Sequence, residues 1–213
     1  TGSHVKKLNY DIINISENIF KEFIDDNKRF PNIHVFNAIM KLYAAFGDIT
    51  SCMDIIHILG TSIEYNIDGK SYYSKIEKGN DDTPIIAIHA LCNYVRINYD
   101  GIMNDDVFDD FWNIVKYLGS KYNDEKTLAY YRVVIGAATL CPGNKGIKII
   151  MEYYDQLTKN GFTPKLSLFD YIYKKSIDLF ENNSNDYTND DINEWLEWIQ
   201  QQKIKQNLNH INK

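Results

Sequence analysis

Apolar residues recur at helical spacing along most of this chain. Between residues 11 and 27, isoleucines and phenylalanines fall largely on one side of a helix that ends before Pro31. Similar stripes continue along the chain, and caps, glycines or prolines mark most of their ends. The pattern predicts helices over residues 11–27, 34–46, 48–59, 83–99, 104–118, 124–141, 145–159, 164–180 and 190–205. The expected fold class is therefore all-α.

Consecutive helices are joined by short polar segments, so each pair is expected to form an antiparallel helical hairpin. We expect Gly47 to end the first helix of one hairpin and Gly119 to end the second helix of the next. A third hairpin turns at residues 142–144. One hairpin cannot bury its own apolar face, so repeated hairpins stack. The expected architecture is an α-solenoid of about four antiparallel hairpins.

One interval interrupts the helical pattern. The segment SIEYNIDGKSYYSKI, residues 62–76, alternates around Asp68 and Gly69, which is the signature of a β-hairpin turn. We interpret residues 60–82 as an inserted loop that lengthens the first repeat. A short β-ribbon is one form that this insertion can take.

Two distant stretches of the chain are similar to each other. They are PNIHVFNAIMKLYAAFGDI, which begins at Pro31, and PKLSLFDYIYKKSI, which begins at Pro164. The alignment matches Pro31 with Pro164, Phe36 with Phe169, Ile39 with Ile172 and Lys41 with Lys174, and it sets Asn37 opposite Asp170. The offset of 170 − 37 = 133 residues corresponds to four repeats of about 33–35 residues, or to three with an insertion.

Composition limits the classes of function. The chain has 213 residues, is 44% hydrophobic and carries a net charge of −6, so binding to nucleic acid would require a local basic stripe. Cys52, Cys92 and Cys141 form neither a disulfide framework nor a CxxC pair, which fits a reducing compartment or a mitochondrial matrix. Residues 1–4 resemble a cloning remnant, so any targeting peptide is expected to lie outside this sequence, and residues 5–213 form the expected helical-repeat domain. No apolar run is long enough for a membrane span.

Motifs for catalysis are absent from the sequence. No GxSxG, HExxH, P-loop or glycine-rich nucleotide motif occurs, so we predict no catalytic residues, metal, cofactor or small-molecule substrate. The acidic residues at 105, 106, 109 and 110 could hold the metal of a nuclease. In the first turns of a helix they fit better as caps and as a solvated face.

The first repeat carries a family resemblance. Residues 31–39, followed by Tyr43-Ala44, Gly47-Asp48-Ile49 and Cys52-Met53, resemble the pentatricopeptide repeat, and so does the junction at residues 150–180. The resemblance implies a right-handed α-solenoid. Two features depart from the family pattern: the repeat spacing is irregular, and Ile135 stands where the third repeat should carry a polar residue. The related tetratricopeptide repeat fits less well, because its first-helix Trp and Leu-Gly are absent.

The resemblance also implies which residues would bind RNA. Helical repeats of this kind present two or three side chains to each base. By resemblance, Asn37 and Asp170 face the base, Asn32 and Lys165 are second readers, and His34 and Ser167 flank the base. Lys41 and Lys174 follow four residues after the base-facing positions, one turn further on, and would meet phosphates. Structural roles compete with these, because Asn37 can be a polar residue of a first turn and Asp170 with Lys174 can form an i,i+4 pair.

The resemblance implies single-stranded RNA as the leading partner. It also implies a role in the processing, stability or translation of transcripts in the mitochondrial matrix. The Asn-, Ile-, Lys- and Tyr-rich composition resembles chains from AT-rich genomes such as those of yeasts, where the family includes the protein subunit of mitochondrial RNase P. Protein subunits of an RNA-processing or translation complex are further expected partners. The alternative function is a protein-interaction scaffold that uses the concave face of a tetratricopeptide-like solenoid, and the acidic balance favours it. A third class, an RNA-cleaving enzyme, would need a metallonuclease domain that this stretch does not show.

Overall fold

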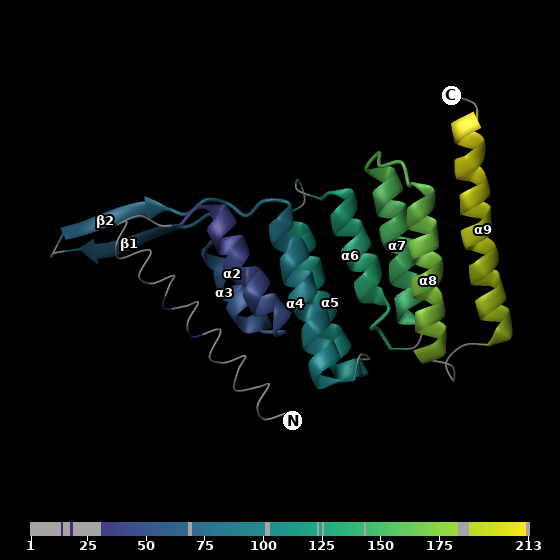
Figure 1. The fold of residues 1–213 in the computed structure, drawn as a ribbon, viewed down its shortest axis with the longest axis horizontal. Coiled ribbons are helices and arrows are strands. Elements are labelled where there is room, and N and C mark those ends of the chain that lie inside the picture. The colour runs from purple at the N-terminus through teal and green to yellow at the C-terminus, as the bar shows by residue number, and fades with distance from the viewer. Residues whose placement is uncertain are drawn as a thin grey trace. The chain divides into compact units, whose positions relative to one another are not determined.

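A computed structural model describes Asn14, Asn18 and residues 31–67, 70–100, 103–122, 124, 126–142, 144–182 and 188–211. Within these residues, eight helices and one pair of strands follow one another along the chain (Figure 1). The chain divides into two compact units, Thr1–Ile97 and Asn98–Lys213. The expected all-α class is confirmed, with a two-stranded ribbon as an addition. Asn14 and Asn18 are helical, and the rest of the predicted helix at 11–27 lies outside the described residues.

The first unit begins with the hairpin of α2 (Ile33–Ala45) and α3 (Ile49–Ile58). Each helix starts at a side-chain cap: Oδ1 of Asn32 accepts from the Val35 amide at 3.2 Å, and Oδ1 of Asp48 accepts from the Ser51 amide at 3.1 Å. Gly47 lies between the helices with a φ of +69°, and a Cβ there would lie 2.8 Å from the backbone nitrogen of Tyr94. The chain therefore turns at Gly47 as predicted, since only glycine combines this φ with this close approach.

The predicted β-ribbon is present in the insertion. Strands β1 (Ser62–Ile67) and β2 (Lys70–Lys75) pair antiparallel, from Ser62 opposite Lys75 to Ile67 opposite Lys70. In Figure 1 the ribbon extends away from α2 and α3. The turn expected at residues 68–69 lies outside the described residues.

The end of the insertion is anchored on α2. Oε2 of Glu77 accepts from the Ile33 amide at 2.9 Å, which satisfies an amide that the first turn of a helix leaves without a partner. Ile76 is 1% exposed and belongs to the apolar cluster that includes Phe36 and Leu59. The insertion therefore closes the end of the first hairpin as well as lengthening the repeat.

The next helix, α4 (Asp82–Asn98), lies along α2 and parallel to it. The Thr83 hydroxyl near its start donates to Oδ1 of Asn37 at 3.0 Å, and Nδ2 of Asn93 near its end donates to the carbonyl of Ala44 at 2.8 Å. The start of α4 thus contacts the first half of α2 and the end of α4 contacts the end of α2, so the two helices run parallel. First helices of neighbouring hairpins pack in this way when hairpins stack in series.

Five helices lie within the described residues of the second unit. They are α5 (Asp105–Lys121), α6 (Leu128–Ala138), α7 (Lys145–Lys159), α8 (Leu166–Asn182) and α9 (Asn189–Ile211). Helix α6 packs against α7 and α8, and α8 packs in addition against α7 and α9. The rings of Tyr130, Tyr131, Tyr153 and Trp112 form an aromatic centre between α5, α6 and α7. The helical hairpins α6–α7 and α8–α9 are thus confirmed.

Three predicted helix ends were wrong. Helix α5 continues past Gly119 to Lys121, and Gly119 serves packing, because a Cβ there would lie 2.6 Å from the Tyr130 hydroxyl. Helix α6 begins at Leu128, since the Thr127 hydroxyl caps it by accepting from the Tyr130 amide. Helix α9 continues to Ile211 rather than ending at 205.

The three cysteines are buried and are not joined in disulfide bonds. Burial raises the pKa of Cys52 to about 12 and that of Cys92 to about 11. Among the described helices, none is both long and apolar enough to cross a bilayer.

Candidate nucleic-acid interface

The two similar sequence stretches occupy equivalent places in two helices, α2 of the first unit and α8 of the second. Counted from the first helical residue, the fourth position is Phe36 in α2 and Phe169 in α8, and both rings are buried. The fifth position is Asn37 or Asp170. Lys41 and Lys174 occupy the ninth positions, and both are exposed. The two stretches therefore share helix position at all three places, but they share burial only at the fourth and ninth.

Asn37 is buried, with 3% of its surface exposed. Its Nδ2 donates to Oδ1 of Asn80 at 2.8 Å, and its Oδ1 accepts from the Thr83 hydroxyl at 3.0 Å. Thr83 is itself fully buried, so the three side chains form a polar network between α2 and the start of α4. Because this amide is buried against Asn80 and Thr83, an RNA base could reach it only if those side chains moved.

Asp170 is exposed, as a base-facing side chain requires, but its carboxylate has a partner. Oδ1 accepts from Nζ of Lys203 on α9 at 2.5 Å, and 65% of the Asp170 side chain is accessible. The i,i+4 pair that the sequence suggested between Asp170 and Lys174 is replaced by this contact between helices. The ion pair is solvent-exposed, so its exchange for a base edge costs little.

The residues at the starts of these helices are accessible. Asn32, His34, Lys165 and Ser167 are all exposed, and Asn32 uses its Oδ1 as the cap of α2. In α8, Ser167, Asp170 and Lys174 follow an i, i+3, i+7 spacing and form one exposed face. In α2, His34 and Lys41 share the exposed face, while Asn37 turns inward to α4.

Helix α6 contributes a further candidate for contact with a base. Its fourth position is Tyr131, which is buried, and its fifth is Arg132, which is exposed. Arg132 is therefore the counterpart of Asn37 and Asp170, and its guanidinium carbon lies 5.3 Å from the ring centre of Tyr171 on α8. Placing Ile135 at this position was wrong, because Ile135 is a fully buried core residue. Counting from the cap at Thr127 would have identified Arg132.

Helix α4 does not follow this pattern. Its fourth and fifth residues are Ile85 and Ile86, so it presents no polar side chain at the equivalent place.

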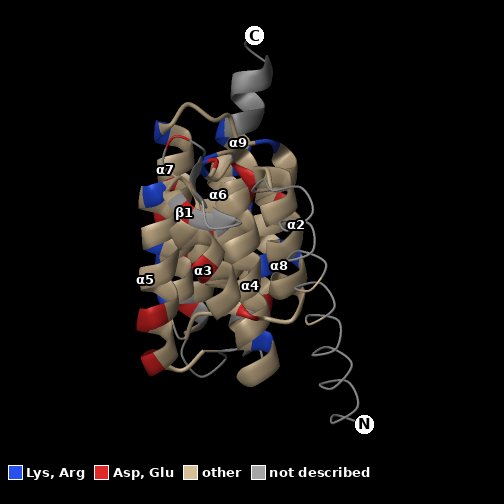
Figure 2. Ribbon diagram, turned by 90° about the vertical axis from the view of Figure 1, so that its left-hand side faces the viewer, with Lys and Arg blue, Asp and Glu red and all other residues tan. Residues whose placement is uncertain are grey.

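Charge is mixed along the helices. In Figure 2, basic and acidic segments are interspersed along the described ribbon. The acidic start of α5 serves the helix, with Asn104 as the cap and with Asp105 accepting from Nζ of Lys145 at 2.6 Å. Among the described residues, no group of three or more His, Cys, Asp or Glu side chains is placed to hold a metal ion.

No protein-family model, curated protein or solved structure matches this chain.

Proposed function

We propose that this protein binds single-stranded RNA through the exposed faces of its first helices, α2 in the first unit and α6 and α8 in the second. The observation that carries the proposal is a recurring pair. In each of these helices a buried aromatic ring at the fourth position precedes a polar side chain at the fifth, as Phe36-Asn37, Tyr131-Arg132 and Phe169-Asp170. Arg132 and Asp170 are exposed, whereas Asn37 is buried, so in α2 the exposed face consists of His34 and Lys41. Repetition of one chemical position along a helical array is how repeat proteins assign side chains to successive bases.

The three polar side chains differ in ways that would distinguish bases. The amide of Asn37 can both donate and accept, the guanidinium of Arg132 only donates, and the carboxylate of Asp170 only accepts. Arg132 lies over the ring of Tyr171, and such a flat guanidinium surface can stack on a base. Exposed Lys41 and Lys174 supply cations for the phosphates between bases.

The finer architecture belongs to the same proposal. Parallel packing of α2 with α4 and contact between α6 and α8 support stacked hairpins, and we infer a right-handed α-solenoid of about four hairpins similar to pentatricopeptide repeats. On this basis we propose a role in RNA processing, stability or translation in the mitochondrial matrix. The acidic net charge implies that affinity depends on a few cations and on base contacts rather than on a general basic surface.

Base preference tests the proposal. The full chain is titrated against labelled oligo-A, oligo-U, oligo-C and oligo-G by fluorescence anisotropy, beside Arg132→Lys and Asp170→Asn. Arg132→Lys keeps the charge but loses the planar fork, so we expect a changed order of base preference with little change in salt dependence. Asp170→Asn replaces a carboxylate, which only accepts hydrogen bonds, with an amide, which also donates them, and should also change the order of base preference.

Two results would contradict the proposal. One is an unchanged order of preference in both variants. The other is the absence of RNA binding even at low salt, which would favour the scaffold function instead.

A further inference from the structure

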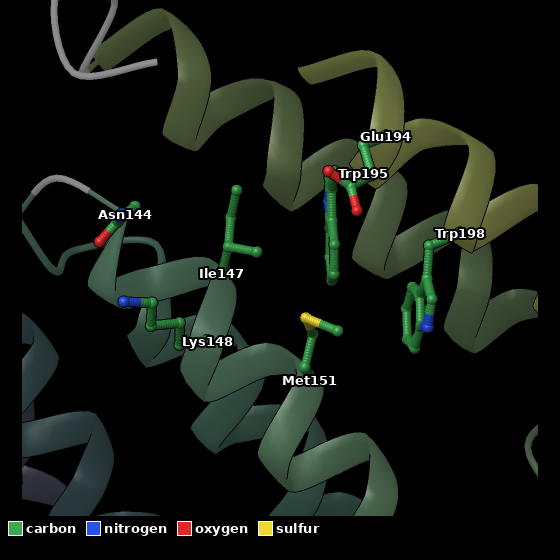
Figure 3. Close-up of a pocket in the computed structure, with 7 residues that line it drawn as sticks. All are labelled: Asn144, Ile147, Lys148, Met151, Glu194, Trp195 and Trp198. Atoms are coloured by element: carbon green, nitrogen blue, oxygen red, sulfur yellow. The ribbon is translucent and has the colours of Figure 1, made fainter. Parts of the chain in front are cut away.

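A groove in the second unit lies between α7 and α9, the second helices of the hairpins, and is separate from the residues proposed to bind RNA. Its volume is about 260 Å³. Figure 3 shows the seven residues that line it, which come from the start of α7 on one side and from α9 on the other: Asn144, Ile147, Lys148, Met151, Glu194, Trp195 and Trp198.

One wall of the groove is aromatic and held in place. The Trp195 and Trp198 rings are stacked, with centroids 4.8 Å apart and planes 10° apart. Nε1 of Trp195 donates to the buried Ser176 hydroxyl at 2.6 Å, and the edge of Trp198 meets Tyr154 at a centroid distance of 5.2 Å. These contacts fix the two indoles before any ligand arrives, so binding against them would cost little conformational entropy.

The opposite wall is apolar and accessible. Met151 is 39% exposed, and Figure 3 shows its side chain extending toward the two indoles. Ile147 precedes it by one helical turn and is half-buried. A flexible thioether beside rigid aromatic rings is a surface that adapts to different apolar side chains.

The rim is polar and carries opposite charges. Lys148 on α7 and Glu194 on α9 are exposed, and neither forms an ion pair with another described residue. Asn144 occupies the cap position of α7, but its side chain makes no capping hydrogen bond, unlike Asn32, Asp48, Asn104 and Thr127 at other helices. The rim therefore offers a cation, an anion and an amide around an apolar centre.

We propose that this groove docks a short segment of a partner protein. The segment places one bulky aliphatic or aromatic side chain between Met151 and Trp198, an acidic residue toward Lys148 and a basic residue toward Glu194. The volume supports this occupant, because about 260 Å³ is below the range of about 300–1,000 Å³ typical of small-molecule sites and suits one or two amino-acid side chains.

Charge and shape argue against other occupants. The carboxylate of Glu194 offsets the attraction of Lys148 for RNA phosphates, and the apolar centre offers phosphates no donor. A second copy that presented the same concave groove could not fill it. A bulky side chain with charges on both sides matches the groove in shape and in charge.

The proposal is tested by selecting a random dodecapeptide library, displayed on phage, for binding to the full chain. The affinity of an enriched peptide is then measured by fluorescence anisotropy. We expect enriched sequences to share a bulky apolar residue between an acidic and a basic one. Met151→Asp should weaken the peptide about tenfold or more, because it places a charge beside the anchoring side chain. Leu166→Asp is the matched control, since Leu166 is similarly exposed, at 43%, on α8. Circular dichroism of both variants establishes that they fold.

The charged residues of the rim provide a second test of peptide binding. Lys148→Glu should weaken the same peptide, and exchanging the acidic residue of the peptide for lysine should restore its affinity. The proposal is overturned if no such sequence is enriched, if Met151→Asp and Leu166→Asp bind the peptide equally, or if the charge exchange restores nothing. It is also overturned if Met151→Asp abolishes RNA binding or self-association rather than peptide binding, since either result assigns the groove to another occupant.

Discussion

Asn37 is where structural and RNA-binding roles compete most directly, and replacing it with alanine separates them. The substitution removes two hydrogen bonds, from Nδ2 to Asn80 at 2.8 Å and from the Thr83 hydroxyl to Oδ1 at 3.0 Å. The two partner side chains can still bond to each other, because the Thr83 hydroxyl lies 3.2 Å from Oδ1 of Asn80 and can donate to it. The cost is therefore that of two net hydrogen bonds, about 1–3 kcal/mol of unfolding free energy.

Urea unfolding followed by far-ultraviolet circular dichroism measures this cost, with Asp170→Ala as the control. Asp170 has an equivalent helix position but makes only an exposed ion pair with Lys203, so its loss should cost less than about 1 kcal/mol. Hydrogen exchange should show the Asn37→Ala effect near the start of α4. An unchanged unfolding midpoint and unchanged exchange in Asn37→Ala would refute the structural role of the amide.

Three further outcomes follow from the packing and from the polar network. Gly119→Ala should lower the unfolding free energy by about 1 kcal/mol, because the new methyl group meets the hydroxyl of the buried Tyr130 and overpacking outweighs the gain in helix propensity. Gly136→Ala provides the comparison and should cost less unfolding free energy, since Tyr171, which it faces, is half-buried and can move. The free energy of unfolding should fall as pH rises above about 9, because Cys52 then ionises in the unfolded chain while burial keeps the native thiol neutral, with its pKa raised to about 12. The expected slope is about 1.4 kcal/mol per pH unit for each such thiol. Equal urea midpoints at pH 8 and pH 10 would contradict this prediction. If Asn37 bonds a base, Asn80→Ala should tighten RNA binding by freeing Nδ2, whereas unchanged anisotropy titrations would indicate that this amide has only a structural role.

Local patterns predicted most of the helices, because caps and apolar stripes depend on residues close together in the sequence. Asn32, Asp48 and Thr127 each bond an amide three residues ahead, and such a contact can be inferred without knowledge of the fold. The β-ribbon was predictable for the same reason, since the sequence alternates on both sides of Asp68-Gly69, and the paired strands lie at the expected residues.

Contacts between distant residues account for what the sequence did not predict. Asn37 is buried by Asn80 and Thr83, which are 43 and 46 residues away, so its environment could not be read from its own helix. Gly119 resembled a helix end, and only the position of Tyr130 in the fold shows that it is a packing residue. Arg132 could not be placed from the sequence, because the start of α6 was predicted four residues too early.

The salt dependence of RNA binding tests the central claim most directly. Anisotropy titrations between 25 and 200 mM salt would compare the full chain with Lys41→Ala/Lys174→Ala and with the charge-matched control Lys116→Ala/Lys159→Ala, whose lysines lie exposed on second helices. If the first helices bind RNA, the double variant should bind more weakly, and its logarithmic salt slope should be shallower by about 1.4, or about 0.7 per lost phosphate contact. The control should match the unmodified chain. Equal affinities and equal slopes in the two double variants would contradict the proposal that the first helices bind RNA.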